Sequence, residues 1–131
     1  MPRRSDCPIS NVLDFVGDIW SLLVVRDLMF TSKRSFSELQ SSDEHIATNI
    51  LSARLVQLER DGLINKQVDP VDKRRKIYTL TPKGVDLMPV ILEMIRWSGM
   101  HDPATNAPQG LLDRIAKERD ELIEELRRSV E

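Results

Sequence analysis

Apolar side chains recur along residues 45–62 with the spacing of one helical face. Leu51, Leu55 and Leu58 stand at positions i, i+4 and i+7, which predicts a helix that packs on a core. The opposite face is formed by small and hydrogen-bonding side chains, at Asn49, Ser52, Ala53 and Val56. This is either the quiet surface of an ordinary amphipathic helix or a face that suits close approach to base edges in a DNA major groove.

The residues before this segment predict two longer helices. Pro8 suits the first turn of a helix that Gly17 closes. Asp18 is predicted to cap the next helix. That second helix runs from Ile19 to about Phe30 and is apolar almost all round at its start, so we expect it to be the buried centre of the fold.

A short helix is predicted between these helices and residues 45–62. Ser35 and Glu38 have the spacing of a capping box at its start, and a polar turn at residues 41–44 follows its end. Two helices joined by a tight turn, the second with a hydrogen-bonding outer face, indicate a helix-turn-helix arrangement.

A β-hairpin is predicted directly after the helix-turn-helix. Residues 63–68 and 77–80 have strand patterns, residues 69–72 form a turn, and the Lys-Arg-Arg-Lys run at 73–76 makes the tip basic. A hairpin in this place is a wing, whose cations can reach phosphates or the minor groove. The charge run alone would indicate only a solvated tip, and the neighbouring helices favour DNA.

The C-terminal third predicts two further helices. Thr81-Pro82 starts one that ends near Gly99, with a kink at Pro89. After a loop, one long helix is predicted from about Leu111 to Ser129, with Arg119 inside its apolar stripe. The other members of that stripe are Leu111, Leu112, Ile115, Leu122, Ile123, Leu126 and Val130. The stripe either folds back on its own core or pairs with a second subunit, and we favour the dimer.

These elements define the expected architecture. The fold class is mainly α with a small β-hairpin (α+β), a winged helix-turn-helix with N- and C-terminal dimerisation helices. Residues 1–100 form the DNA-binding part with the first dimerisation helix, and residues 101–131 form a loop and the C-terminal dimerisation helix of the same structural unit. A dimer presents two recognition helices about one DNA turn, roughly 34 Å, apart.

Charge distribution changes this picture more than total charge does. The formal net charge of −2 does not indicate nucleic-acid binding. Residues 66–83, however, hold 6 Lys and Arg against 2 Asp and Glu, whereas residues 101–131 hold 5 against 8. No apolar run is long enough to cross a membrane and no export signal is evident, so we expect no membrane association. A single cysteine excludes an internal disulfide framework and fits a cytoplasmic location.

Candidate catalytic and metal-ligating residues are few. His45 and His101 are the only histidines, and neither forms a pair with metal-ligand spacing together with Cys7. No nucleophile–base set, glycine-rich phosphate loop or paired carboxylates in an apolar setting occurs. We therefore expect no enzyme activity, no catalytic residue, no metal and no cofactor.

Several motifs occur in an order and spacing that are specific together. They are Cys7-Pro8, Gly17-Asp18-Ile19-Trp20, Phe36-Ser37-Glu38-Leu39, Leu51-Ser52-Ala53-Arg54-Leu55, Leu58-Glu59-Arg60-Asp61-Gly62-Leu63-Ile64, Tyr78-Thr79-Leu80-Thr81-Pro82-Lys83-Gly84, and Pro89 with Trp97. With these motifs the chain resembles the HxlR-type transcription regulators, a winged-helix group related to MarR-type regulators. The resemblance implies a homodimeric regulator that binds double-stranded DNA at a pseudo-palindromic operator.

The resemblance also assigns roles to residues. It places DNA contacts in the recognition helix, at Thr48, Asn49, Ser52, Ala53 and Arg54, and in the wing, at Lys73, Arg74 and Arg75. It places phosphate contacts near the short helix, at Arg34, Ser35 and Ser37. Three features depart from the family pattern: Ala47-Thr48 replaces Ser-Pro, Val56 replaces a common Lys, and the acidic C-terminal helix is longer than usual.

Cys7 stands where several members of the family carry a thiol that senses electrophiles or oxidants. A helix N-terminus and nearby Arg3 and Arg4 would favour the thiolate, whereas Asp6 opposes it. The alternative is a partly buried structural cysteine. A small molecule bound between the core and the last helix is another hypothesis for control. The main alternative for the whole chain is a winged-helix protein-interaction module without direct DNA readout.

Overall fold

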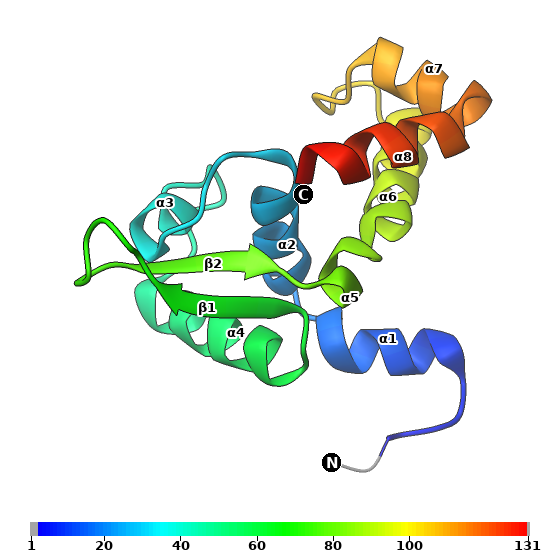
Figure 1. Ribbon diagram of the computed structural model, residues 1–131. Helices are drawn as coiled ribbons and strands as arrows, with labels where there is room; N and C mark the ends of the chain where they lie inside the picture. The colour runs from blue at the N-terminus through cyan, green and yellow to red at the C-terminus, as the bar shows by residue number, and fades with distance from the viewer. Residues whose placement is uncertain (1–2, 131) are drawn as a thin grey trace. The chain divides into compact units, whose positions relative to one another are not determined.

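Helices and one hairpin make up the structure. The computed structural model describes residues 3–130. Residues 1, 2 and 131, at the outer ends of the predicted segments 1–100 and 101–131, lie outside it. Within the described residues the elements are α1 (Pro8–Val16), α2 (Ser21–Phe30), α3 (Phe36–Gln40), α4 (Thr48–Arg60), β1 (Ile64–Val68), β2 (Lys76–Leu80), α5 (Pro82–Val85), α6 (Met88–His101), α7 (Gln109–Lys117) and α8 (Arg119–Val130) (Figure 1). The predicted fold class, mainly α with a small β-hairpin, is confirmed, and the dimerisation role of the terminal helices remains a prediction.

The chain divides into two compact units, one up to Gly84 and one from Val85 onward. The predicted segments 1–100 and 101–131 divided the chain by role, and those roles remain predictions.

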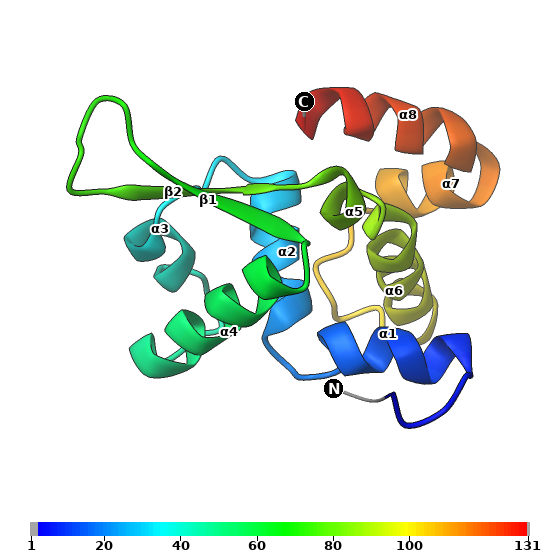
Figure 2. The same cartoon turned by 60° about the horizontal axis from the view of Figure 1, so that its bottom comes forward.

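The first unit packs α2, α3 and α4 with the antiparallel hairpin. The strands pair from Ile64 with Leu80 to Val68 with Lys76. In Figures 1 and 2 the hairpin lies across α3 and α4, and its turn extends beyond them. The buried side chains of this unit include Val24, Val25, Leu28, Leu39, Leu51, Leu55, Leu58, Leu63, Ile64 and Tyr78. α2 therefore contributes to the core, as its apolar sequence predicts.

The start of α2 differs from the prediction. Asp18 accepts hydrogen bonds from the backbone N–H groups of Trp20 and Ser21, at 3.0 and 2.9 Å, so the helix begins at Ser21. Ile19 is left in the turn, where it is 76% exposed. The N-cap of α2 is Trp20, so the predicted cap position at Asp18 is wrong by two residues, although the Asp18 carboxylate still accepts from backbone N–H groups at the helix start. Ile19 is not part of the buried helix.

α4 is shorter than the segment from residue 45 to residue 62. It begins at Thr48, after Ala47 at the N-cap, because His45 adopts a left-handed backbone conformation with φ of 57°. Its end is as predicted, since Gly62 has φ of 79°, which favours glycine.

The second unit contains two breaks that were not predicted. A short turn after α5 ends the first helix, and Pro89 lies in the first turn of a separate helix, α6. Backbone N–H groups in the first turn of a helix have no partner within the helix, so the N–H that proline lacks is not missed there. The long C-terminal helix is divided at Glu118 into α7 and α8. Ile115 and Leu122 are buried, so the stripe folds back within this unit. Gly99 permits the close approach, since a Cβ there would lie 2.7 Å from Leu112 Cδ1.

Among residues 3–130, no single helix is both long and apolar enough to cross a bilayer. α1 and α2 pass a length and composition test only together, with an 80° bend between them.

Candidate nucleic-acid interface

The outer face of α4 is exposed as its sequence pattern predicts. Leu51, Leu55 and Leu58 are buried and fix the rotation of the helix about its axis. This rotation exposes the predicted base-reading side chains, Thr48, Asn49, Ser52 and Ala53, together with Val56. Their small size lets the backbone approach a partner closely, and the hydroxyls and the amide can exchange hydrogen bonds with base edges. Thr48 also accepts a hydrogen bond of 2.5 Å from Gln40 of α3.

Arg54 lies on a flank of α4, away from this outer face. It pairs with Asp18 at 3.8 Å and is about one-third exposed. Burial opposes ionisation of Asp18, but hydrogen bonds from the Ser21 hydroxyl and from the N–H groups of Trp20 and Ser21 outweigh it and lower the pKa of Asp18. A DNA contact by Arg54 stays a prediction, and it would require the guanidinium to leave the carboxylate of Asp18.

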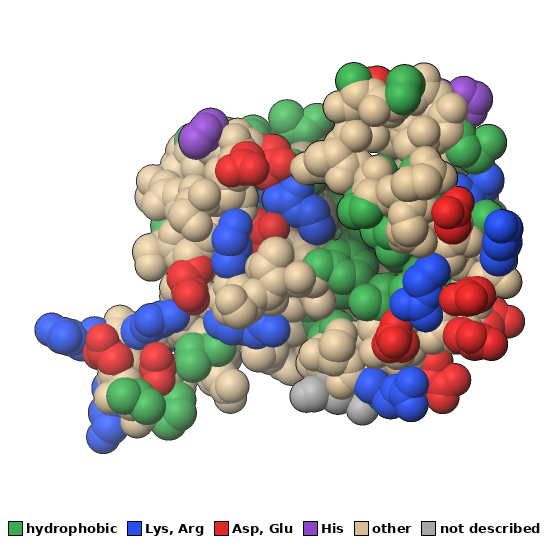
Figure 3. All heavy atoms as spheres, turned by 90° about the horizontal axis from the view of Figure 1, so that it is seen from above, with side chains coloured by type: hydrophobic (Ala, Val, Ile, Leu, Met, Phe, Trp, Pro, Cys, Tyr) green, Lys and Arg blue, Asp and Glu red, His purple; other side chains and the backbone are tan. Residues whose placement is uncertain are grey.

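The turn of the hairpin presents cations at its tip. Asp69 and Asp72 accept hydrogen bonds from the backbone N–H groups of Val71 and Arg74, at 2.8 and 3.0 Å, and thereby shape the turn. Lys73 is exposed. The Arg74 side chain is 93% exposed, and its Nε lies 3.3 Å from the Asp72 carboxylate within the same turn. The projecting lobe at the left of Figure 3 carries blue side chains at its outer end. These two cations are placed to meet an external anion.

Arg75 is arranged differently from its two neighbours. Its guanidinium lies 2.7 Å from Glu38 of α3 and 3.8 Å from Asp69. Backbone N–H groups of Ser35 and Arg34, the Ser35 hydroxyl and Arg75 together lower the pKa of Glu38. Arg75 therefore joins the wing to α3, and contact with DNA remains a prediction for it.

The three predicted phosphate-binding residues near α3 also differ in availability. Ser35 is buried and forms the predicted capping box with Glu38, which is confirmed. The guanidinium of Arg34 donates to the carbonyl groups of Thr31 and Lys33. Ser37 is the exposed hydroxyl of this group. Phosphate contact at these positions remains a prediction, and Ser37 is the most accessible of the three.

A polar network beside the α3–α4 turn was missed by sequence reasoning. The buried carboxylate of Asp27 accepts a hydrogen bond from the Ser42 hydroxyl, and Arg26 pairs with both Asp27 and Glu44. The one available signal was an aspartate within the apolar run of α2.

Glu44 gives this network a measurable pH dependence. Arg26 donates to both oxygens of Glu44, at 2.8 and 2.9 Å, and lowers its pKa to about 2 from an ordinary value of 4.5. A lowered carboxyl pKa adds stability above the unfolded-state value, and this stability is lost as pH falls through the folded-state value. We expect Glu44→Gln to lower the melting midpoint at pH 7, and the difference from the native chain to shrink between pH 4.5 and 2. Thermal melting across this range checks it, and a difference that stays constant with pH would contradict it. In an Arg26→Met background the substitution should have little effect.

Cys7 lies at the N-cap of α1 and is exposed, so the alternative of a partly buried structural cysteine does not describe its surroundings. Arg4 pairs with Asp14 at 2.8 Å. The exposed thiol is open to a reagent in solution. Across the described part of the chain, no group of three or more His, Cys, Asp or Glu is arranged to hold a metal ion.

Two helices joined by a turn, an exposed hydrogen-bonding face on the second, and a hairpin with a cationic tip define a winged helix-turn-helix protein. The HxlR-like helix-turn-helix family model matches residues 15–106. The chain belongs to this family, whose members are transcriptional regulators and not enzymes.

Individual relatives agree with this assignment. The HTH-type transcriptional regulator sll1512 of Synechocystis is 39% identical over 88 residues, which are 67% of this chain and 64% of that protein. The crystal structure of PA1607, a putative transcription factor, covers 81% of this chain and 72% of its own at 33% identity, with a TM-score of 0.71. Reduced YodB of Bacillus subtilis covers 77% of this chain and 100% of its own at 33% identity, with a TM-score of 0.61, and a quinone-bound YodB structure is also similar.

Proposed function

We propose that this regulator binds a pseudo-palindromic operator as a homodimer. α4 enters the major groove with Thr48, Asn49, Ser52 and Ala53 toward the bases, and Lys73 and Arg74 of the wing contact phosphates or the minor groove. The observation that carries the proposal is the exposed face of small, hydrogen-bonding side chains on α4 beside a cationic hairpin tip in the same unit. Action on chromosomal DNA implies a cytoplasmic location.

Exposed apolar side chains on α1 and on α6 support the dimer. On α1, Ile9 is 70% and Leu13 is 52% exposed. On α6, Val90, Met94 and Trp97 follow one another at spacings of four and three residues, and Met94 and Trp97 are more than half exposed. Covering these apolar side chains with a second copy would remove them from water and lower the free energy of the dimer relative to two monomers. The apolar stripe of α7 and α8 is partly used inside its own unit, so α6 replaces it in the proposed interface.

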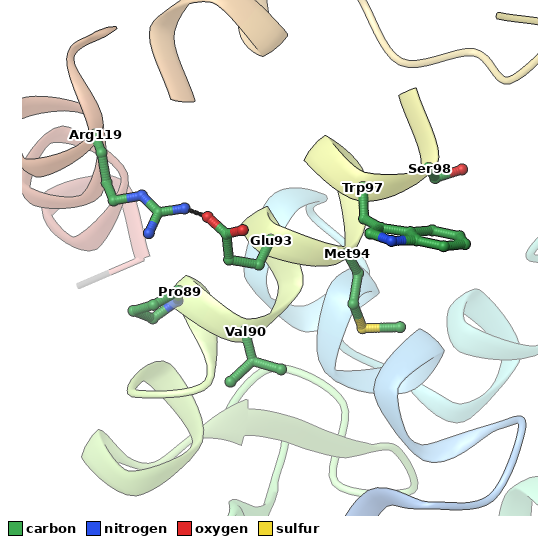
Figure 4. Close-up of a pocket in the computed structure, with 7 residues that line it drawn as sticks. All are labelled: Pro89, Val90, Glu93, Met94, Trp97, Ser98 and Arg119. Atoms are coloured by element: carbon green, nitrogen blue, oxygen red, sulfur yellow. Dashed lines mark ion pairs between the residues drawn. The ribbon is translucent and has the colours of Figure 1, made fainter. Parts of the chain in front are cut away.

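The exposed apolar side chains of α6 line a hollow in the second unit. Its volume is about 760 Å³, and Figure 4 shows Val90, Met94 and Trp97 along it, with Arg119 of α8 paired to Glu93 at its edge. A side chain of the second copy fits such a hollow. A small-molecule effector is the alternative occupant, and the lining indicates an apolar one.

Cys7 is the proposed point of control. YodB, a relative, has been solved in reduced and quinone-bound forms, and the thiol of Cys7 is exposed at the start of α1. Because α1 belongs to the proposed dimer surface, modification of Cys7 would change the spacing of the two recognition helices.

A protein-interaction module is the second candidate function. Val56 is 52% exposed in the middle of the α4 outer face, where it offers apolar area to a protein partner. The cationic wing tip favours DNA over this alternative.

A fluorescence-anisotropy titration tests the proposal. The chain is titrated against its own upstream DNA and a scrambled duplex at two salt concentrations, with and without a thiol oxidant. We expect tight, salt-dependent binding that prefers the upstream DNA, and an oxidant effect that disappears in Cys7→Ser. Selective binding without any oxidant effect would remove Cys7 from control. Equal binding to both duplexes would favour the protein-interaction module.

A further inference from the structure

A closed set of polar contacts fastens the turn between α3 and α4 to α2. We call Arg26, Asp27, Lys33, Ser42 and Glu44 the turn anchor. Asp27 is 4% exposed, and its carboxylate accepts from the Ser42 hydroxyl and, at 3.0 Å, from Arg26 Nε. Lys33 Nζ donates to Ser42 Oγ at 2.9 Å. The buried carboxylate therefore has one partner in the turn, Ser42, and one on its own helix, Arg26, as its burial requires.

A second connection lies at the surface of the same turn. Arg26 donates to both carboxylate oxygens of Glu44, at 2.8 and 2.9 Å. A bidentate arginine–carboxylate pair fixes orientation as well as distance, because two parallel hydrogen bonds hold both planar groups. The turn is thus held at Ser42 from inside and at Glu44 from outside.

The held segment leads directly into the recognition helix. Between Glu44 and Thr48 the chain passes through His45, with φ of 57°, and through Ile46, which is 7% exposed. Ala47 at the N-cap makes no side-chain cap hydrogen bond, so the start of α4 has no local fastening of that kind. Packing of the buried leucines fixes the rotation of α4, and the Gln40–Thr48 hydrogen bond and the segment before Thr48 fix where its first turn lies.

We propose that the turn anchor positions the first turn of α4 for base readout, and that Arg26, Asp27 and Glu44 are positioning residues for operator recognition. This inference rests on the proposed function. Loosening the anchor weakens contacts at base edges, which need exact placement, more than contacts with phosphates. The selectivity of binding should therefore fall while affinity for unrelated DNA stays the same.

Glu44→Gln is the main test, because it breaks the exposed pair and leaves Asp27 with Arg26 and Ser42. Asp86→Asn is the matched control, since it makes the same change of charge at an exposed ion pair with Arg127 in the second unit. Affinities for the upstream DNA and for a scrambled duplex of equal length are measured at one salt concentration. We expect their ratio to fall by about tenfold in Glu44→Gln, the size of one weakened base contact, and to be unchanged in Asp86→Asn.

Ser42→Ala provides a second variant, which loosens the anchor from inside. A ratio equal to that of the native chain in both anchor variants would overturn the inference, even if their melting midpoints fall, because the anchor would then only stabilise the fold. A parallel loss of affinity for both duplexes would also overturn it. If the native chain itself binds the two duplexes equally, the proposed function fails, and the inference fails with it.

Discussion

Replacing Lys73 and Arg74 with alanine is expected to weaken binding to every duplex by a similar factor. Each cation at the wing tip would neutralise one phosphate and release counterions, so the slope of log K against log salt should fall by about 0.9 for each phosphate that is no longer neutralised. Because neither side chain contacts the core of the first unit, the melting midpoint should stay near that of the native chain. Anisotropy titrations at several salt concentrations measure both affinity and slope.

A control variant separates phosphate binding from total charge. Lys117→Ala with Arg128→Ala removes the same charge from exposed positions in the second unit. It should leave the salt slope close to that of the native chain. Arg75→Ala is a poor substitute, because its ion pair with Glu38 joins the wing to α3, whereas the Arg74–Asp72 pair lies within the exposed turn. Equal slopes for the wing variant and the native chain would show that the wing tip does not contact phosphates.

Met94→Glu is expected to convert the proposed dimer into monomers and to reduce operator affinity by about two orders of magnitude. A charge placed in the centre of an apolar interface loses its hydration without gaining a partner. A monomer binds one half-site and loses the gain from linked binding of two, which is on the order of 10²–10⁴. Light scattering with size-exclusion chromatography measures the mass, and anisotropy measures the affinity.

Met94→Gln is the matched control, since it keeps the length of the side chain without a charge. It should remain largely dimeric. A dimeric Met94→Glu would exclude the α6 surface as the interface. A monomeric variant with native operator affinity would instead show that one copy is sufficient for binding.

Elements specified by neighbouring residues were predictable from the sequence. The capping box at Ser35 and Glu38, the glycine after α4 and the two strands all depend on patterns a few residues long. The exposed face of α4 was predictable for the same reason, because three leucines at helical spacing fix which side is buried. Many of the family motifs lie in the same short segments, at the start of α3, along α4 and in the second strand.

The breaks in the second unit could not be predicted in this way. Pro89 is compatible with either a kinked helix or the first turn of a new one, and the turn before it decides. The division at Glu118 follows from packing between helices. A signal existed there: Arg119 interrupts the apolar stripe, and in the structure it pairs with Glu93 of α6.

Contacts between distant residues were also beyond the sequence pattern. Arg75 and Glu38 are 37 positions apart, and Arg26 and Glu44 are 18 apart. A pattern of charges shows which residues can pair but not which pairs the fold brings together. For this reason the sequence predicts DNA contact equally for Lys73, Arg74 and Arg75. The structure distinguishes Arg75, because its guanidinium pairs with Glu38 of α3.

The hairpin is unevenly fastened along its length. Near its base Ile64 and Tyr78 are buried, and the Tyr78 N–H donates to the Arg34 carbonyl at 2.8 Å. At the turn Val71 is 93% exposed. Amide protons near the base should therefore exchange with solvent only in rare openings, whereas those at the exposed turn, whose hydrogen bonds are local, should exchange more readily. The core holds the base of the arm and only neighbouring residues hold its outermost turn, so in the proposed complex the turn would adjust more readily than the base to a duplex whose groove width varies.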